Sequence, residues 1–71
     1  MPYALNADLP EPIRASLPRH AQDIYRAAFN SAFASYAGSR RHEEIAHRVA
    51  WAAVKRRYVM RGARWVERDA A

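Results

Sequence analysis

Residues 18–38, PRHAQDIYRAAFNSAFASYAG, contain the clearest helical pattern in the chain. Pro18 suits the first position of a helix, where the N–H that proline lacks has no helical partner in any case. Apolar residues then recur at the i, i+3, i+4, i+7 spacing of an amphipathic helix: Ala21, Ile24, Tyr25, Ala28, Phe29, Ala32 and Tyr36. Gly38 suits the left-handed conformation that ends many helices. We therefore predict a helix over residues 18–37.

A second long helix follows after a short link. Ser39 is a plausible N-cap, and Glu43 and Glu44 suit a first helical turn, so this helix should begin between Arg40 and Glu43. A link of this length makes the two helices antiparallel neighbours. Gly62 marks the expected stop of the pattern.

The second long helix carries two apolar stripes. One contains Ile45, Val49, Ala52 and Ala53, and the other contains Trp51, Val54 and Tyr58. A helix that is apolar on two sides is expected to be covered on two sides. Its small residues, Ala46, Ala50, Ala52 and Ala53, would allow the other long helix to approach closely.

The two ends of the chain add smaller elements. Leu9-Pro10-Glu11-Pro12 predicts a short helix ending near Leu17. Trp65 is expected to fold back on the core, and its segment could pair with residues 3–5 as a two-stranded ribbon joining the termini. The expected fold is mainly α, with one compact three-helix domain over residues 1–71 that consists of a short helix and an antiparallel helix pair. A small two-stranded ribbon that joins the termini is a possible further element.

Length and composition exclude several classes of protein. The chain has 71 residues, and a domain of this size buries only roughly 60% of the surface that its unfolded chain exposes. Without cysteine it has no disulfides, thiolate metal ligands or cysteine nucleophiles. The first residues, MPYALNADLP, do not resemble a signal peptide, and no stretch approaches the ~18 apolar residues of a membrane span. We expect a cytoplasmic protein without a membrane span.

The excess of positive over negative charge lies entirely in the second half of the chain. Residues 40–71 contain nine of the twelve Lys and Arg residues and four of the seven Asp and Glu residues, which accounts for the whole net charge of +5. The candidate residues for an anionic partner are Arg48, Lys55, Arg56, Arg57, Arg61, Arg64 and Arg68. This pattern is compatible with nucleic-acid binding. A solubilising role for the same charges is the alternative.

No residue set indicates catalysis or a cofactor. His20 and Asp23 are one helical turn apart, as in a general-base pair, but no nucleophile accompanies them, and helix-terminal roles explain both. Glu44 and His47 form a Glu-x-x-His, yet a carboxylate-bridged metal site needs two such copies and further glutamates. We predict a protein that is not an enzyme and has no metal or cofactor.

Several separate blocks of the sequence resemble the ChaB family. They are Leu17-Pro18, His20-Ala21-Gln22-Asp23-Ile24-Tyr25, Ala28-Phe29-Asn30-Ser31-Ala32 and Ala46-His47-Arg48-Val49-Ala50-Trp51-Ala52-Ala53-Val54-Lys55. Met1-Pro2-Tyr3, Asp8-Leu9-Pro10, Tyr58 and Trp65 follow in the family's order. The resemblance implies a compact set of helices with a small sheet, and a regulator of cation transport associated with a sodium/calcium-proton antiporter.

The resemblance also implies where a partner would dock. It is densest on the first long helix, where packing alone does not require the polar residues His20, Gln22, Asp23 and Asn30. We therefore predict a docking surface for a protein partner there, with a membrane antiporter or its regulator as candidate partner. The family pattern has a longer, more acidic stretch between the long helices, where this chain has residues 37–41, AGSRR, so we do not expect this link to bind a cation.

Overall fold

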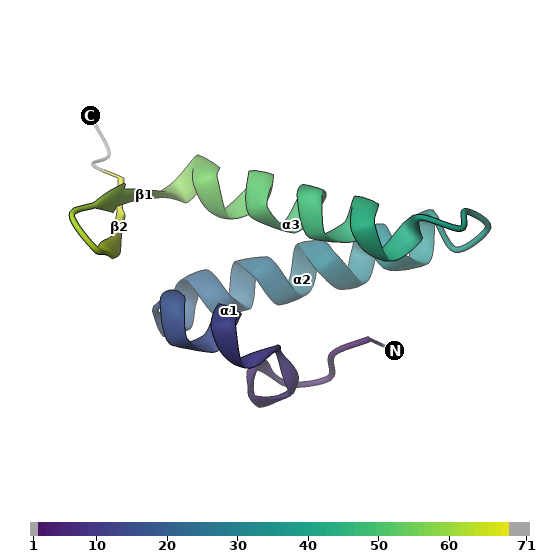
Figure 1. Ribbon diagram of the computed structural model, residues 1–71, viewed down its shortest axis with the longest axis horizontal. Helices are drawn as coiled ribbons and strands as arrows, with labels where there is room; N and C mark the ends of the chain where they lie inside the picture. The colour runs from purple at the N-terminus through teal and green to yellow at the C-terminus, as the bar shows by residue number, and fades with distance from the viewer. Residues whose placement is uncertain (1, 69–71) are drawn as a thin grey trace.

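The computed structural model describes residues 2–68. Within them the chain forms a 3-10 turn and three α-helices, followed by two strands (Figure 1). The elements are η1 (Asn6–Asp8), α1 (Glu11–Ser16), α2 (Arg19–Ser35), α3 (His42–Arg57), β1 (Tyr58–Arg61) and β2 (Arg64–Glu67). The predicted short helix and the two long helices are therefore confirmed, although α3 ends at Arg57 and not at the predicted stop, Gly62.

The helices α2 and α3 lie side by side and antiparallel, and the core lies between them (Figure 1). Buried residues of α2 recur every three or four positions, at Ala21, Tyr25, Phe29 and Ala32. On α3 the buried residues are small, Ala46, Ala50 and Val54, which leaves room for the α2 aromatic rings. Full burial of a side chain such as Phe29 stabilises the fold by about 2–3 kcal/mol.

One predicted stripe of α3 faces the core only in part, since Ile45 and Ala53 are half-buried. Val49 is 39% exposed and Ala52 is also exposed, whereas Ala46 and Ala50 are completely buried. The prediction was wrong at Val49 and Ala52 because apolar residues occur on several sides of α3, so the apolar pattern alone does not distinguish its faces. The other predicted stripe, with Val54 and Tyr58, is buried.

The link between the long helices is a turn of a different kind from the one predicted. Among the described residues, Gly62 has a positive φ, at 61°, whereas Gly38 does not. Gly38 is therefore not a left-handed helix cap. The chain leaves α2 at Tyr36, whose carbonyl accepts from the N–H of Ser39 at 2.9 Å. The N-cap of α3 is Arg41 and not the predicted Ser39. The Oγ of Ser39 accepts a hydrogen bond from the Arg41 N–H at 3.1 Å, which closes the turn before α3.

The two-stranded sheet is confirmed, and its strand β2 is the predicted Trp65 segment, but the partner strand is β1 in place of the predicted residues 3–5. Strands β1 and β2 form an antiparallel hairpin that pairs Tyr58 with Glu67 and Arg61 with Arg64. The chain reverses at Gly62, which adopts the positive φ that glycine tolerates best. A tight local turn therefore replaces the expected pairing between the termini. Trp65 folds back on the core, as predicted.

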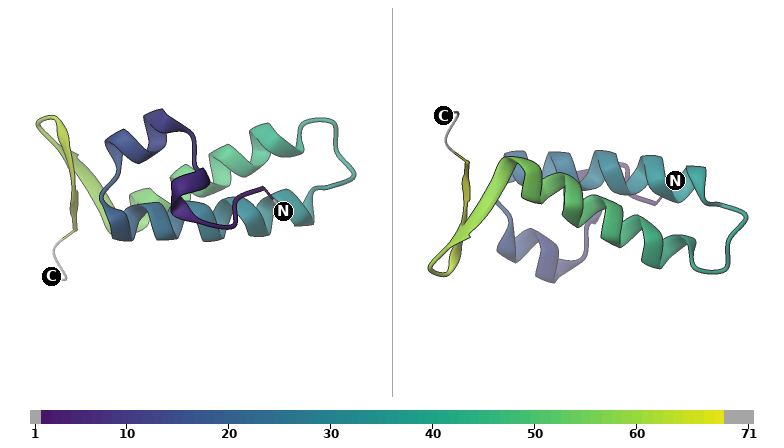
Figure 2. Two further views of the ribbon diagram at one scale, coloured as in Figure 1. Left: turned by 90° about the horizontal axis from the view of Figure 1, so that it is seen from below. Right: turned by 90° about the horizontal axis from the view of Figure 1, so that it is seen from above.

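The N-terminal segment lies along α2, away from the hairpin (Figure 2). Asn30 holds it there, since its Nδ2 donates to the Tyr3 carbonyl at 2.7 Å and its Oδ1 accepts from the Tyr3 N–H at 3.3 Å. Asn30 thus occupies the backbone groups of Tyr3 that a terminal ribbon would have used. The short helix α1 follows and is framed by two buried leucines, Leu9 and Leu17.

Candidate functional site

The polar residues predicted as a docking surface on α2 each hold a neighbouring segment. His20 is exposed, and its Nδ1 hydrogen-bonds the hydroxyl of Tyr58 on β1 at 3.1 Å. The Nε2 of Gln22 donates to the Leu17 carbonyl at 2.9 Å and to the Arg14 carbonyl at 3.3 Å, which fixes the end of α1. These two residues therefore face different elements.

Asp23 and Asn30 both hold the N-terminal segment. Asp23 Oδ1 accepts from Nδ2 of Asn6 at 2.6 Å, and Arg26 Nε donates to the Asn6 side-chain oxygen at 2.7 Å. Asn30 binds Tyr3, as described above. All four predicted residues thus have intramolecular partners, and their role in docking stays a prediction.

A second tyrosine–histidine pair joins the long helices. The hydroxyl of Tyr25 on α2 hydrogen-bonds Nδ1 of His47 on α3. Burial is the main reason that the pKa of Tyr25 is raised to about 12, so the hydroxyl keeps its proton. His47 also packs edge-on against Phe29, with ring centroids 4.8 Å apart. Part of its side chain remains accessible at the surface.

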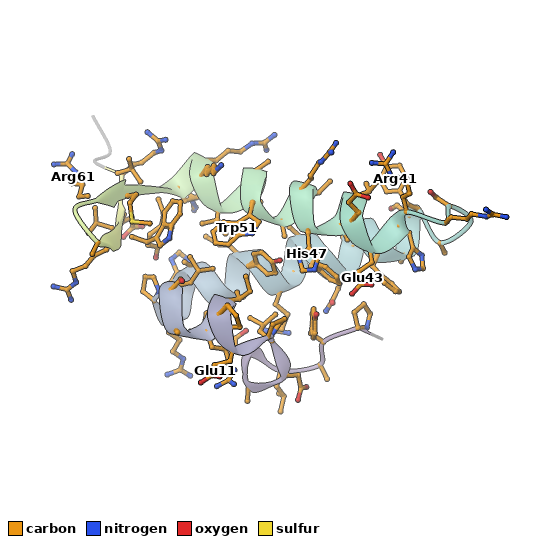
Figure 3. The ribbon with its side chains drawn as sticks, in the orientation of Figure 1. Glu11, Arg41, Glu43, His47, Trp51 and Arg61 are labelled. Atoms are coloured by element: carbon orange, nitrogen blue, oxygen red, sulfur yellow. The ribbon has the colours of Figure 1, made fainter. Side chains whose placement is uncertain are left out.

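His47 lines a surface groove along one side of α3. Glu44, His47, Arg48, Trp51, Ala52, Lys55 and Trp65 form this Trp51–Trp65 groove. His47 and Trp51 project from the same side of α3 (Figure 3). Trp65 reaches the groove from β2, with its ring centroid 5.6 Å from that of Trp51. The hairpin therefore supplies one wall of the groove.

The sequence pattern does not predict this groove. Trp51 belongs to an apolar stripe and Trp65 is expected to fold back on the core, and both are indeed partly buried against it. A signal was nevertheless present, because Trp51 follows Arg48 by three residues and precedes Lys55 by four. This spacing places an aromatic ring between two cations on one helix face. The approach of Trp65 depends on the hairpin, which was not predicted.

The seven candidate basic residues are all exposed. Basic side chains project along the outer side of α3, between Arg41 at one end of the molecule and Arg61 at the other (Figure 3). Arg48 and Lys55 lie on the groove, and Arg61 pairs with Arg64 across the hairpin. Arg68 joins them, since its Nε donates to the carbonyl of Lys55 at 2.8 Å. The structure therefore brings Arg68 next to the end of α3.

The groove has one acidic residue, and its charge is already balanced. Glu44 accepts two hydrogen bonds from Arg41, from Nε at 3.1 Å and from Nη2 at 2.9 Å. The Arg48 guanidinium is farther away, at 3.6 Å. The pKa of Glu44 is lowered, first by its hydrogen bonds to Arg41 and then by the charge of that arginine. The rim thus offers Arg48 and Lys55 to an anionic group.

Residues 2–68 contain neither a cluster of metal ligands nor a membrane-spanning helix. No group of three or more His, Asp or Glu side chains there is arranged to hold a metal ion. None of the helices in this part of the chain is both long and apolar enough to cross a membrane.

The fold and the groove define a small helical-hairpin domain that ends in a β hairpin. The model of the ChaB family matches residues 9–68. The chain belongs to the ChaB family, which confirms the resemblance seen in the sequence.

Individual relatives agree with this membership. An Escherichia coli (strain K12) protein named "Putative cation transport regulator ChaB" is 55% identical over 64 residues, which cover 82% of this chain and 84% of the relative. A Shigella flexneri protein of the same name matches equally well. The NMR solution structure of a ChaB protein has a TM-score of 0.82 and 47% identity, and the match covers 96% of this chain and 100% of that one.

Proposed function

We propose that this chain is a small non-enzymatic module that regulates cation transport by docking on another protein. The names of the Escherichia coli and Shigella flexneri relatives provide the link to cation transport. The observation that carries the docking proposal is the Trp51–Trp65 groove. Two tryptophans remain partly accessible there beside Arg48 and Lys55, and partly accessible aromatic rings next to cations are common anchors in protein interfaces.

The contacts of the two candidate catalytic side chains support a non-enzymatic role. A general base is usually oriented by the group that it hydrogen-bonds. His20 is hydrogen-bonded to Tyr58, and Asp23 is hydrogen-bonded to Asn6. Each of the two residues therefore has a partner other than the second member of the His20–Asp23 pair. Their positions serve the attachment of the hairpin and the N-terminal segment to α2.

The polar residues of α2 remain a second docking surface in this proposal. The side chain of Asp23 is 49% exposed despite its bond to Asn6, and His20 is exposed beside the hairpin. A partner could contact both without displacing the buried rings. The groove and this polar surface would then contact different parts of one partner.

The proposed partner is a sodium/calcium-proton antiporter or a regulator of it. The test is the rate of sodium- or calcium-driven proton movement in inverted membrane vesicles that contain the host's antiporter. Adding the purified protein should change this rate, and the Trp65→Ala variant should have a smaller effect at the same concentration. An unchanged rate at saturating protein would contradict the proposed role in transport.

Nucleic-acid binding is a second candidate function. All seven candidate basic residues are exposed, and the arginines of the hairpin continue the basic side of α3. Affinity for duplex or single-stranded DNA should then fall steeply between low and physiological salt. The reason is that Lys and Arg side chains release counterions from the phosphates when they bind, and added salt opposes this release. Changing Arg56 and Arg57 to Ala should weaken binding further. Absence of binding at low salt would exclude this function.

A further inference from the structure

We infer that the Trp51–Trp65 groove binds an acidic amphipathic helix of a partner protein, whose apolar residues contact the two tryptophans while its carboxylates meet Arg48 and Lys55. This inference rests on the proposed docking function and adds the chemistry of the partner. It is carried by three features of the groove: its supported aromatic floor, the spacing of its cations and its charge.

The floor of the groove is held in place by the core. Trp51 packs edge-on against Tyr25, with ring centroids 5.4 Å apart, and Tyr25 is completely buried. On its other side Trp51 lies against Trp65. A ring supported in this way loses little side-chain freedom when a partner covers it, so docking on it costs less entropy than docking on a mobile side chain. Ala52 is exposed beside it and leaves space for an incoming apolar side chain.

The shape and spacing of the groove fit a helix. It follows α3 from Glu44 to Lys55, which is roughly 16 Å at the ~1.5 Å rise of an α-helix. Arg48 and Lys55 are seven residues apart, or about two turns. A partner helix lying along α3 presents side chains at the same i, i+7 interval, with apolar anchors between them. Two carboxylates spaced by two turns can therefore reach both cations.

Charge selects an acidic partner. Glu44 is shared by Arg41, which donates two hydrogen bonds to it, and by Arg48, whose Nη2 lies 3.6 Å away, so these three residues leave one net positive charge on the rim beside that of Lys55. A second copy of this chain would bring the same cations to the same rim and is disfavoured by repulsion. Because aromatic rings and Ala52 make up the floor, apolar side chains suit it better than a sugar–phosphate backbone does.

The inference can be tested with synthetic peptides as probes. The first is an amphipathic helix of about 18 residues, with Leu at i, i+3, i+4 and i+7 and Glu on the flanks. The second has Gln in place of each Glu, and the third has Lys. Trp51 and Trp65 are the two tryptophans of the chain, so intrinsic fluorescence reports on the groove directly. The Glu peptide should bind, the Gln peptide should bind roughly tenfold more weakly, and the Lys peptide should bind weakest.

Variants of the protein locate the binding site. Ala52→Gln replaces an exposed residue and places a larger side chain in the groove. The double variant Arg48→Gln with Lys55→Gln removes the positive charges of the rim. Each should weaken binding of the Glu peptide by about tenfold or more. The matched controls are Ala27→Gln on α2 and Arg19→Gln with Arg40→Gln, all at exposed positions outside the groove. These should change the affinity less than about twofold. Circular dichroism of each variant verifies the helical content.

Several results would overturn the inference. They are equal affinity for all three peptides, no binding of any peptide, and unchanged affinity in the Ala52→Gln variant. Competition by a single-stranded oligonucleotide that also depends on Ala52 would assign the groove to nucleic acid instead. Concentration-dependent dimerisation abolished by Ala52→Gln would assign it to a second copy.

The peptide experiment is independent of cation transport. If the Glu peptide binds at the groove while the antiporter rate is unchanged, the docking chemistry holds and the proposed process is wrong. If the protein changes that rate but Ala52→Gln does not alter the effect, the regulatory role holds and the groove is not its docking site.

Discussion

The hydroxyl of Tyr25 on α2 and Nδ1 of His47 on α3 form a hydrogen bond between the two long helices. The bond connects the core to the surface, because Tyr25 is completely buried whereas His47 lines the Trp51–Trp65 groove. Tyr25 also packs against Trp51. One buried side chain thus supports two residues of the proposed docking groove.

Removing the Tyr25 hydroxyl should destabilise the protein. Tyr25→Phe keeps the ring in the core but leaves Nδ1 of His47 without its partner in a partly buried position. The expected loss in free energy of unfolding is about 1–2 kcal/mol, measured by urea denaturation followed by circular dichroism. Tyr36→Phe is the control, since Tyr36 is 47% exposed, and it should change stability by less than about 0.5 kcal/mol. Equal effects of the two substitutions would contradict the role of this bond.

Stability should decrease at alkaline pH. Burial raises the pKa of Tyr25 from 10.0 to about 12, so between these values the unfolded chain loses the tyrosine proton while the folded protein keeps it. The folded state is therefore fully stable, as far as Tyr25 is concerned, below about pH 10, and it loses stability as the pH rises toward 12. Burial also raises the pKa of Tyr3 and Tyr58, so they act in the same direction.

The measurement for this pH dependence is a series of urea titrations from pH 9 to pH 12. Tyr25→Phe should reduce the slope of stability against pH without removing it, because Tyr3 and Tyr58 still titrate. A slope that is identical in the variant would show that Tyr25 does not contribute.

Loss of the Phe29 ring should prevent stable folding. Phe29 is 1% exposed, and truncation of a buried phenylalanine to alanine costs about 3–5 kcal/mol. A domain of this size has little stability in reserve, so Phe29→Ala should be largely unfolded at 25 °C by circular dichroism. Val49→Ala on α3 provides the contrast. Val49 is 39% exposed, and its truncation should leave the protein folded.

The two glycines should respond oppositely to alanine. Gly62 has a φ of 61°, so Gly62→Ala places a side chain in a strained backbone conformation and should cost about 1 kcal/mol or more. Gly38 is not in that region, and nothing lies within 4 Å of the Cβ that alanine would add. Gly38→Ala should therefore be neutral or stabilising by up to about 1 kcal/mol. Thermal melting of both variants measures the difference.

Much of the fold could be predicted because α2 carries a strong signal. Two of its four buried residues, Tyr25 and Phe29, are large, and polar residues such as Gln22, Arg26 and Asn30 lie between the buried positions, so the spacing identifies the core face. On α3 the buried residues are small and several exposed or half-buried residues are apolar, so no such contrast exists. Ala50 is completely buried and Ala52 is exposed, although the two residues are identical and close in sequence. Only the position of α2 distinguishes them.

The hairpin and the groove were harder to predict. Gly62 was interpreted as a helix stop, whereas it is the turn between two short strands that begin with Tyr58 and Arg64. The groove then depends on this turn, because it brings Trp65 against Trp51 from fourteen residues farther along the chain. A contact of this kind results from tertiary structure and leaves only a weak trace in the local sequence.

The central claim is that the Trp51–Trp65 groove is a docking site for an acidic helix. It is tested most directly by the affinity of the Glu peptide for the Ala52→Gln variant, compared with Ala27→Gln, by tryptophan fluorescence titration. We expect the dissociation constant to rise by about tenfold or more in Ala52→Gln and to remain within about twofold in Ala27→Gln. Equal dissociation constants for the two variants would contradict the claim.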